Sequence, residues 1–342
     1  MSETATRKGH QIFTNELTRF AERTGDARIA ALIADVDGPL RIAVRGRDGV
    51  GRGTVAAALA GAGLTVVDGD TAVDVDVIVM AEAPKPEDLE MLGAGTRPRW
   101  PTLVVLNKAD LSGFGAGGPI AVAGRRAAQY QALTGAPTVP MVALLASARL
   151  DDELIGALRV LTAERADLTS TDGFLSGQHS LPPDVRARLL DTIDLFGIAH
   201  GVLALRHGAD GAALPAVLRR LSQVDRVVAH VALAGAEMRY RRVRSALAEL
   251  RTVAAGGRPD VDEFLCGDDV VVAVMAVAVD VVEAAGLSVD PADEPSAHLR
   301  RAQHWHRYSR GPVNQLHRSC GADICRGSLT LLQRTRSRSE AR

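Results

Sequence analysis

Aromatic residues are scarce in this chain of 342 residues: Phe, Trp and Tyr together make up 3% of it, whereas hydrophobic residues as a whole make up 46%. The apolar content is enough for real cores and excludes disorder as the main state. Those cores must be built from Ala, Val and Leu, which favours helices and buried parallel strands over a β-sandwich. The length suits two compact domains.

Cysteine is also sparse. Cys266, Cys320 and Cys325 are too few for a disulfide framework in a chain of this size. Residues 1–13 contain no apolar stretch typical of a secretory signal. The most apolar run, Val270 to Val279, is much shorter than the roughly 20 residues that span a bilayer, so we expect a buried helix there. These absences predict a cytoplasmic protein.

Lysine is the rarest charged residue, because Lys8, Lys85 and Lys108 are the only lysines among 40 basic residues. A lysine inside a motif is therefore more informative than usual. The 41 acidic residues leave a net charge of −1, which argues against a general polyanion binder, and no specific nucleic-acid partner is expected.

Short apolar runs alternate with helical stretches over the first half of the chain. Such alternation with wholly apolar strands predicts an α/β fold, a mostly parallel sheet with helices on both faces. The expected strands are 41–46, 64–70, 76–83, 102–110 and 139–147, and the expected helices are 54–63, 86–95, 125–133 and 151–166.

After residue 170 no strand is evident, and apolar residues recur at helical spacing from Pro183 onward. We expect an all-helical domain to follow the α/β domain. The predicted organisation is a helical lead-in (1–38), the α/β domain (39–168), the helical domain (175–332) and a disordered basic tail (333–342).

A glycine-rich turn joins the first expected strand to the first helix of the α/β domain. There, glycines allow backbone N–H groups to surround phosphate oxygens, and the helix N-terminus adds partial positive charge. A phosphate-binding loop reads G-x-x-x-x-G-K-[ST], but here Arg52 and Gly53 occupy the last two positions. An ordinary strand-to-helix turn is the alternative. The expected phosphate-binding residues are Gly46, Asp48, Gly49, Val50, Gly51, Arg52, Gly53 and Thr54.

A second motif, Asn107-Lys108-Ala109-Asp110, follows the apolar strand that begins at Thr102. An aspartate here can accept hydrogen bonds from N1–H and the 2-amino group of guanine, while the asparagine fixes the loop and the lysine stem covers the purine. Ser147 and Ala148, after the next expected strand, form a weaker third guanine-binding element.

The three motifs together resemble those of P-loop GTPases of the translation-factor-related class, over roughly residues 41–166. The helical segments 193–208 and 239–250 loosely resemble the extensions of actinobacterial dynamin-like GTPases. The resemblance implies GTP or GDP as ligand and a role as a regulatory switch.

The chain departs from this pattern at the positions that GTP hydrolysis requires. Gly53 lacks the hydroxyl that binds Mg²⁺, no D-x-x-G occurs between the glycine-rich turn and Asn107, and Asp68 is the nearest candidate for holding Mg²⁺ through water. A bound Mg²⁺ is thus poorly supported, and at most slow GTP hydrolysis is expected. Two alternatives stay open: a nucleotide-free pseudo-GTPase scaffold that binds a protein partner, and, with less support, a small-molecule kinase.

The C-terminal region 297–342 contains ten arginines but only Asp323 and Glu340 as acids. This balance suits peripheral contact with anionic membranes, but a solvated or intramolecularly paired arginine-rich helix explains it more simply. The same region holds a group that zinc could use, or that packs without metal: His304, His306, His317, Cys320 and Cys325.

Overall fold

The computed structural model describes residues 8–69, 73–93, 100–113 and 115–340. It divides the chain into two compact units. The sheet unit is Leu40–Val231, and the helical unit combines Met1–Pro39 with Ala232–Arg342. We describe each unit by itself.

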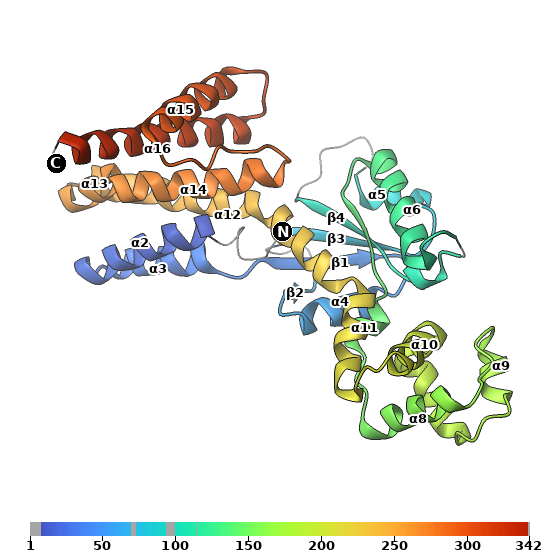
Figure 1. Ribbon diagram of the computed structural model, residues 1–342. Helices are drawn as coiled ribbons and strands as arrows, with labels where there is room; N and C mark the ends of the chain where they lie inside the picture. Colours follow the sequence, from blue (N-terminus) through green and yellow to red (C-terminus); the bar gives the residue numbers. More distant parts are fainter. Residues whose placement is uncertain (1–7, 70–72, 94–99, 114, 341–342) are drawn as a thin grey trace. The chain divides into compact units, whose positions relative to one another are not determined.

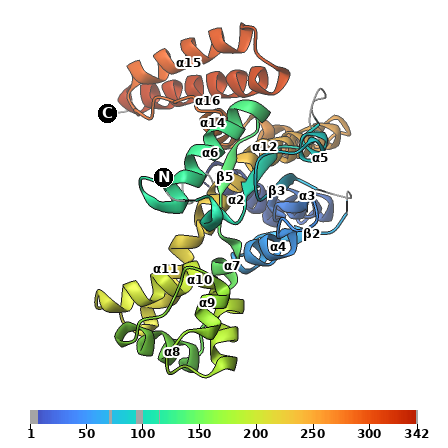
Figure 2. The same cartoon turned by 90° about the vertical axis from the view of Figure 1, so that its right-hand side faces the viewer.

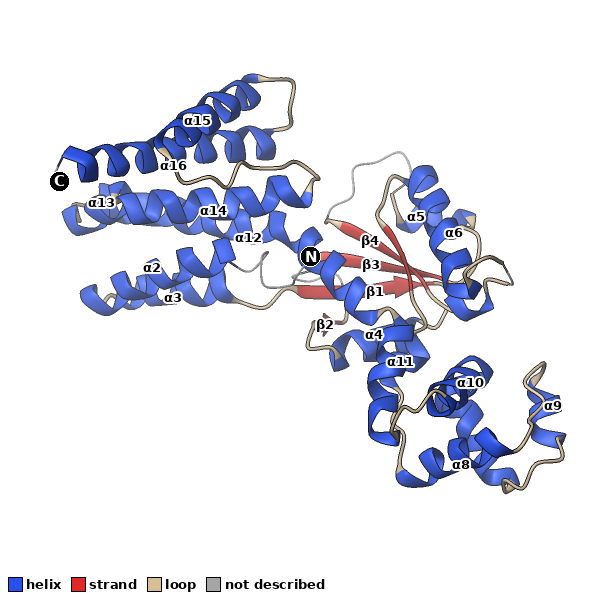
Figure 3. Ribbon diagram, in the orientation of Figure 1, coloured by secondary structure: helices blue, strands red, loops and turns tan. Residues whose placement is uncertain are grey.

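Five parallel strands form one sheet in the order β2-β1-β3-β4-β5 (Figures 1 and 3). Because all strands run the same way, their carboxyl ends, and the loops that follow them, lie along one edge. The strands are Arg41–Gly46 (β1), Thr65–Val67 (β2), Val75–Met80 (β3), Thr102–Leu106 (β4) and Thr138–Pro140 (β5).

Helices cover both faces of the sheet, which confirms the predicted α/β architecture. In β3, Val77 and Val79 pack in the core that contains residues of α4 and α12, whereas Ile78 and Met80 pack in the core beside α5. Alternate side chains of one strand thus reach opposite faces, and because both faces are covered β3 is apolar at every position from Val77 to Met80. The helices named here are Arg52–Gly61 (α4), Pro86–Met91 (α5) and Val224–Ala255 (α12).

The sheet unit also contains a group of helices that follows β5 (Figure 2). A core cluster joins them to Ala123 and Ala127 of α6 and to Leu106 at the end of β4. The remaining elements of the unit are Ala109–Leu111 (η1), Gly118–Thr134 (α6), Ala143–Ser147 (α7), Asp152–Ala163 (α8), Thr171–Ser176 (α9), Pro183–Arg206 (α10), Gly211–Ala213 (η2) and Leu214–Ser222 (α11).

The helical unit is formed by segments from both ends of the chain. Phe13 and Leu17 of α2 are fully buried in a cluster that also contains Tyr240, Val277 and Trp305. Apart from the later part of α12, its helices are Lys8–Thr24 (α2), Ala27–Asp37 (α3), Pro259–Cys266 (α13), Asp268–Ala284 (α14), Pro295–Arg310 (α15) and Gln315–Glu340 (α16). The predicted buried helix around Val270–Val279 is α14, which confirms that prediction.

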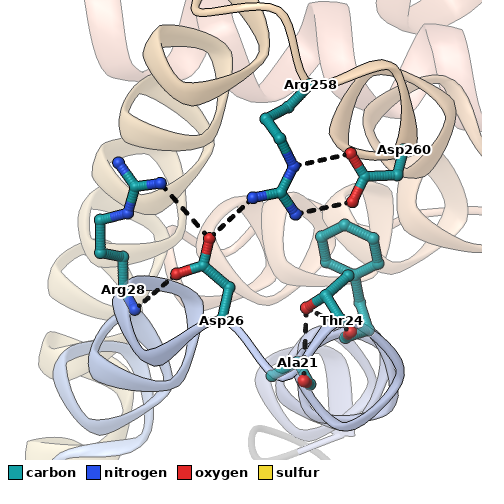
Figure 4. A network of polar contacts seen from close by, with 7 residues as sticks. Ala21, Thr24, Asp26, Arg28, Arg258 and Asp260 are labelled. Atoms are coloured by element: carbon teal, nitrogen blue, oxygen red, sulfur yellow. Dashed lines mark hydrogen bonds and ion pairs between the residues drawn. The ribbon is translucent and has the colours of Figure 1, made fainter.

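A polar network fixes the turn between α2 and α3 within the helical unit (Figure 4). Asp26 caps α3 by accepting a hydrogen bond from the Arg28 N–H, and its carboxylate also binds Arg258 Nη1 at 2.9 Å. Arg258 in turn makes two bonds to Asp260, at 2.9 and 2.7 Å. The start of α13 is thereby tied to the start of α3.

Two structural expectations require correction. The run 139–147 is not one strand, because β5 ends at Pro140 and Ala143–Ser147 is the helix α7. The segment 333–342 is not a disordered tail as far as it is described, because α16 continues to Glu340.

The observed units also differ from the expected division at residues 168 and 175. The helices between 171 and 222 share a core with β4 and α6, so they belong to the sheet unit. The lead-in 1–38 shares its core with residues beyond 232. None of the helices among the described residues contains an apolar stretch sufficient for crossing a membrane.

Candidate functional site

The loop between β1 and α4 has a conformation that depends on its glycines. Gly49 and Gly51 have φ values of 80° and 83°, a region in which residues with a Cβ are strained. At Gly51 a Cβ would also lie 2.6 Å from Nδ2 of Asn107. Glycine at position 51 thus allows the loop and the Asn107 side chain to approach each other.

Several backbone N–H groups of this loop have no acceptor. Those of Asp48, Gly49, Gly51, Arg52 and Gly53 donate to no carbonyl or carboxylate within the described part of the chain. α4 also starts without a side-chain cap at Gly51. Free N–H groups next to a helix N-terminus attract anions, so the loop has the features of a phosphate-binding site.

Asn107 joins this loop to two neighbouring strands. Its side chain is buried, with 4% exposed, and its Nδ2 donates to the Val50 carbonyl at 3.0 Å. Its Oδ1 accepts from the Ala143 N–H at 3.1 Å, and its own N–H donates to the Met80 carbonyl at 2.6 Å. One asparagine therefore fixes the loops that follow β1 and β5 while continuing the ladder with β3.

Lys108 makes a second contact between the motif at 107–110 and the loop that joins β1 to α4. Its Nζ donates to the Gly49 carbonyl at 2.8 Å. Its backbone has a φ of 55°, which is uncommon for a residue with a side chain. Strain of this kind is often kept at functional sites because the surroundings enforce it.

Asp110 follows in the short helix η1 and is half-buried. Burial raises the pKa of its carboxyl above the usual range, and the nearby Asp194 raises that pKa further, whereas Lys108 lowers it. Asp194 lies in α10 at a non-helical position with a φ of 53°. A partly desolvated carboxylate beside another acid would be stabilised by a ligand that donates hydrogen bonds to it.

The weaker element, Ser147 and Ala148, lies at the end of α7. The Ser147 hydroxyl is exposed and donates to the carbonyls of Ala143 and Leu144 in its own helix, at 3.5 and 3.3 Å. The start of α7 is held by Asn107, as described above. The structure thus links this segment to the motif at 107–110 through the backbone of Ala143.

The residues expected at the start of α4 are accessible. Arg52 and Gly53 are exposed and Thr54 is half-buried. Asp68 is also exposed, and it follows β2, which pairs with β1. The register pairs Val67 with Ala43, so Asp68 lies about two residues, or roughly 7 Å, before the level of Gly46 where the loop begins.

A cavity of about 640 Å³ opens beside the loop that joins β1 to α4. The loops after β1, β3 and β4 and the helix α6 form its walls, and four basic side chains but only two acidic ones line it. Its charged lining residues are Arg47, Asp48, Glu82, Lys85, Lys108 and Arg126.

Arg47, Asp88 and Lys85 form a connection that the sequence motifs did not reveal. Asp88 is fully buried; it accepts from Arg47 Nε at 2.9 Å and from the Lys85 N–H at 2.9 Å. The loop between β1 and α4 is thereby tied to the segment after β3. Two signals in the sequence could have indicated this: Asp88 occupies the third position of a helix that begins with Pro86, and Lys85 is one of only three lysines.

The His/Cys group near the C-terminus is not assembled into a metal site. No three His, Cys, Asp or Glu side chains of the described residues come together in a way that could hold a metal. Instead, His317 Nδ1 lies 2.7 Å from the Tyr308 hydroxyl, and burial raises the pKa of the Cys320 thiol to about 12.

Comparison of the chain with known proteins finds no relative. No family model matches the chain, and neither a curated protein nor a solved structure shows significant similarity to it.

Proposed function

We propose that the sheet unit binds a guanine nucleotide, GTP or GDP, and acts as a regulatory switch with weak or absent hydrolysis. The observation that carries this proposal is the pair of hydrogen bonds from Asn107 and Lys108 to the carbonyls of Val50 and Gly49. These bonds place a motif suited to a purine base directly against a loop suited to phosphates.

The phosphates would lie on the loop from Gly46 to Thr54. Its free N–H groups and the N-terminus of α4 stabilise negative charge without needing side-chain groups. Arg52 adds a full positive charge at the first residue of the helix.

The base would be recognised by Asp110, with the Lys108 stem against the purine ring. The Asp110 carboxylate accepts no hydrogen bond from any other residue of the described ranges, and it is already partly desolvated. Guanine offers two adjacent donors, N1–H and the 2-amino group, whereas adenine offers a different pattern. This difference is the basis for the proposed preference for guanine over adenine.

Hydrolysis would be slow because the groups that assist it are missing. Gly53 has no hydroxyl for Mg²⁺. Asp68 lies at the level of Val44 in β1, about two residues before the loop begins at Gly46. Phosphoryl transfer depends on charge neutralisation and alignment of the attacking water. The site therefore favours binding over turnover.

Isothermal titration calorimetry of the full chain with GDP, GTP and ATP, with and without Mg²⁺, tests the proposal. We expect GDP and GTP to bind below millimolar concentration and ATP to bind more weakly than either. Equal binding of ATP and GTP would remove the role of Asp110 in reading the base.

An Asp110→Asn variant tests the base contact directly. It removes a charged acceptor, so guanine nucleotides should bind more weakly by about 1.5–3 kcal/mol, while ATP binding should not change. Asp194→Asn is the matched control, because it neutralises the neighbouring acid and its Oδ1 can still accept from the Leu195 N–H. Equal losses in both variants would point to general electrostatics rather than to base recognition.

The alternative is a pseudo-GTPase that binds no nucleotide and serves as a scaffold for a protein partner. Arg52 and Gly53 in place of lysine and a hydroxyl residue favour it. Absorbance and chromatography of the denatured protein show whether it is purified with nucleotide. Bound GDP or GTP would exclude the scaffold reading, and complete absence of binding in the calorimetry would support it.

A further inference from the structure

The proposed phosphate site lacks a compact cation at the position where one is needed. An ammonium group can approach phosphate oxygens as a point charge, whereas a guanidinium is planar and larger. Arg52 occupies the lysine position of the loop, but it is exposed and does not line the cavity beside the loop.

We propose that Lys85 supplies the ammonium group that neutralises phosphates bound by the loop, in place of the missing lysine at position 52. This inference rests on the proposed nucleotide binding. Lys85 lines the same cavity as Asp48 and Gly49 of the loop, although it comes from the segment after β3.

The position of Lys85 is fixed relative to the loop. Its N–H donates to one carboxylate oxygen of Asp88, and the other oxygen of this buried carboxylate accepts from Arg47 of the loop. The Asp88 carboxylate thus links the backbone of Lys85 to Arg47 of the loop, and the flexible Lys85 side chain extends from this anchored backbone. This is the arrangement expected of a lysine that reaches a ligand on that loop.

The other cations of the cavity are less suited to this role. Arg47 is paired with Asp88, and Lys108 donates to the Gly49 carbonyl. Arg126 lies on α6, which packs mainly against β5 and η1. The Lys85 ammonium makes no hydrogen bond or ion pair with the described residues, so it is available to a ligand.

The distribution of lysine supports the assignment. Two of the three lysines in the chain, Lys85 and Lys108, line this cavity, while 37 of the 40 basic residues are arginines. Lys108 already has a role in joining the base motif to the loop. Lys85 is the lysine for which the proposed site otherwise provides no function.

Calorimetry with GTP, ATP and inorganic tripolyphosphate on the full chain tests the inference. Lys85→Met keeps most of the stem and removes the charge, and it should weaken binding of GTP and tripolyphosphate roughly 10- to 100-fold. Arg126→Met is the matched control, since it removes one charge from the same cavity, and we expect less than about a threefold change. Lys85→Arg should recover part of the loss because the charge is retained.

The outcomes separate the two proposals. Unchanged binding by Lys85→Met, or a larger loss in Arg126→Met, would overturn the role of Lys85 and leave nucleotide binding standing. Lys85-dependent binding of tripolyphosphate without preference for GTP over ATP would support Lys85 and contradict guanine recognition. If neither GTP nor tripolyphosphate binds the wild-type protein, both proposals fail. Thermal melting of each variant confirms that it is folded.

Discussion

Among single residues, Asn107 has a structural role that is separate from its proposed role in nucleotide binding. Its side chain satisfies the Val50 carbonyl and the Ala143 N–H, so it stabilises the sheet unit whether or not a ligand binds. Lys108, its neighbour, is exposed and makes only one contact of this kind. The two residues of one motif should thus differ strongly in their effects on stability.

Asn107→Ala should destabilise the protein by about 2–4 kcal/mol, because it leaves two buried backbone groups unpaired and creates a small cavity. Lys108→Ala should cost less than about 1 kcal/mol, since its ammonium is exposed. Urea unfolding without nucleotide measures both. Similar effects of the two changes would show that the Asn107 hydrogen bonds contribute little to stability.

The motif residues illustrate what could be read from the sequence at this scale. Asn107 and Lys108 were identified because they form a continuous motif after an apolar strand. The Arg47–Asp88–Lys85 connection was missed because Arg47 is 41 residues from Asp88, so no local pattern joins the loop to the segment that contains Lys85. The burial of Asp88 follows only from the packing of α5 against β3 of the sheet.

Among the elements, the junction between α2 and α14 contains an unusual carboxylate. The carboxylate of Asp280 in α14 lies against the backbone of Gly9 and His10 at the start of α2. The pKa of Asp280 is raised to about 7: burial is the largest cause and Glu283 adds to it, whereas Arg239 and the N–H groups of Gly9 and His10 act in the opposite direction. Burial also lowers the pKa of the His10 imidazole to about 4.

These shifts have opposite effects on stability. A raised carboxyl pKa means that the folded state binds the Asp280 proton more tightly, so its contribution to stability falls as pH rises from about 4 to about 7. A lowered imidazole pKa means that the His10 contribution is complete above pH 6.5 and is lost as pH falls toward 4. The two trends offset each other in mildly acidic solution.

Asp280→Asn removes the titrating carboxyl, and with it the fall in stability as pH rises from about 4 to about 7. The amide oxygen can still accept from the N–H groups of Gly9 and His10. The stability of the variant relative to wild type should therefore increase with pH between about 4 and 7 and level off above 7, by a total on the order of 2–4 kcal/mol. Urea unfolding at several pH values measures the difference. A difference that does not vary with pH would show that Asp280 titrates normally.

The boundaries of the elements show a further limit of sequence reading. β1 was predicted at 41–46, where the structure has it, because an apolar run ends there in a glycine-rich turn. The run 139–147 is equally apolar, yet it contains both β5 and α7. A buried helix and a buried strand are both apolar throughout, so periodicity does not separate them.

For the whole molecule, the two-unit organisation was the feature least accessible to sequence. A helical lead-in was predicted at 1–38, and α2 and α3 lie there, but the core that Phe13 and Leu17 join includes residues more than 200 positions further along the chain. Such contacts leave no local signal. The last strand ends at Pro140 and the sheet unit extends to Val231, so the change in composition near residue 170 marks neither boundary.

The basic C-terminal region presents exposed arginines on α15 and α16. Truncation before this region would be a poor test of membrane binding, because Trp305, Cys320 and Ile324 are buried in the core of the helical unit. Substitution of surface arginines avoids this problem. Four that are exposed and form no ion pair with described residues are Arg307, Arg310, Arg318 and Arg326.

Changing these four arginines to glutamine should weaken binding to phosphatidylserine-containing vesicles by at least about 10-fold at low salt, since each basic residue near such a surface contributes about 1 kcal/mol. High salt should release the wild-type protein. Flotation assays measure both effects. Four exposed arginines of the sheet unit serve as the control set for the same substitution: Arg149, Arg165, Arg220 and Arg226. Equal flotation of both variants, or none by wild type, would contradict the membrane role.

The joining of both chain ends in the helical unit has a consequence for synthesis on the ribosome. The helices α2 and α3 emerge first, but α14, against which α2 packs, is translated about 240 residues later. At 5–20 residues per second the delay is on the order of 10–50 s. During this time the sheet unit can fold, whereas Phe13, Leu17 and Phe20 lack their native cover. Until the last third of the protein has been made, the apolar face of α2 and α3 must therefore stay exposed to solvent or be shielded by a chaperone.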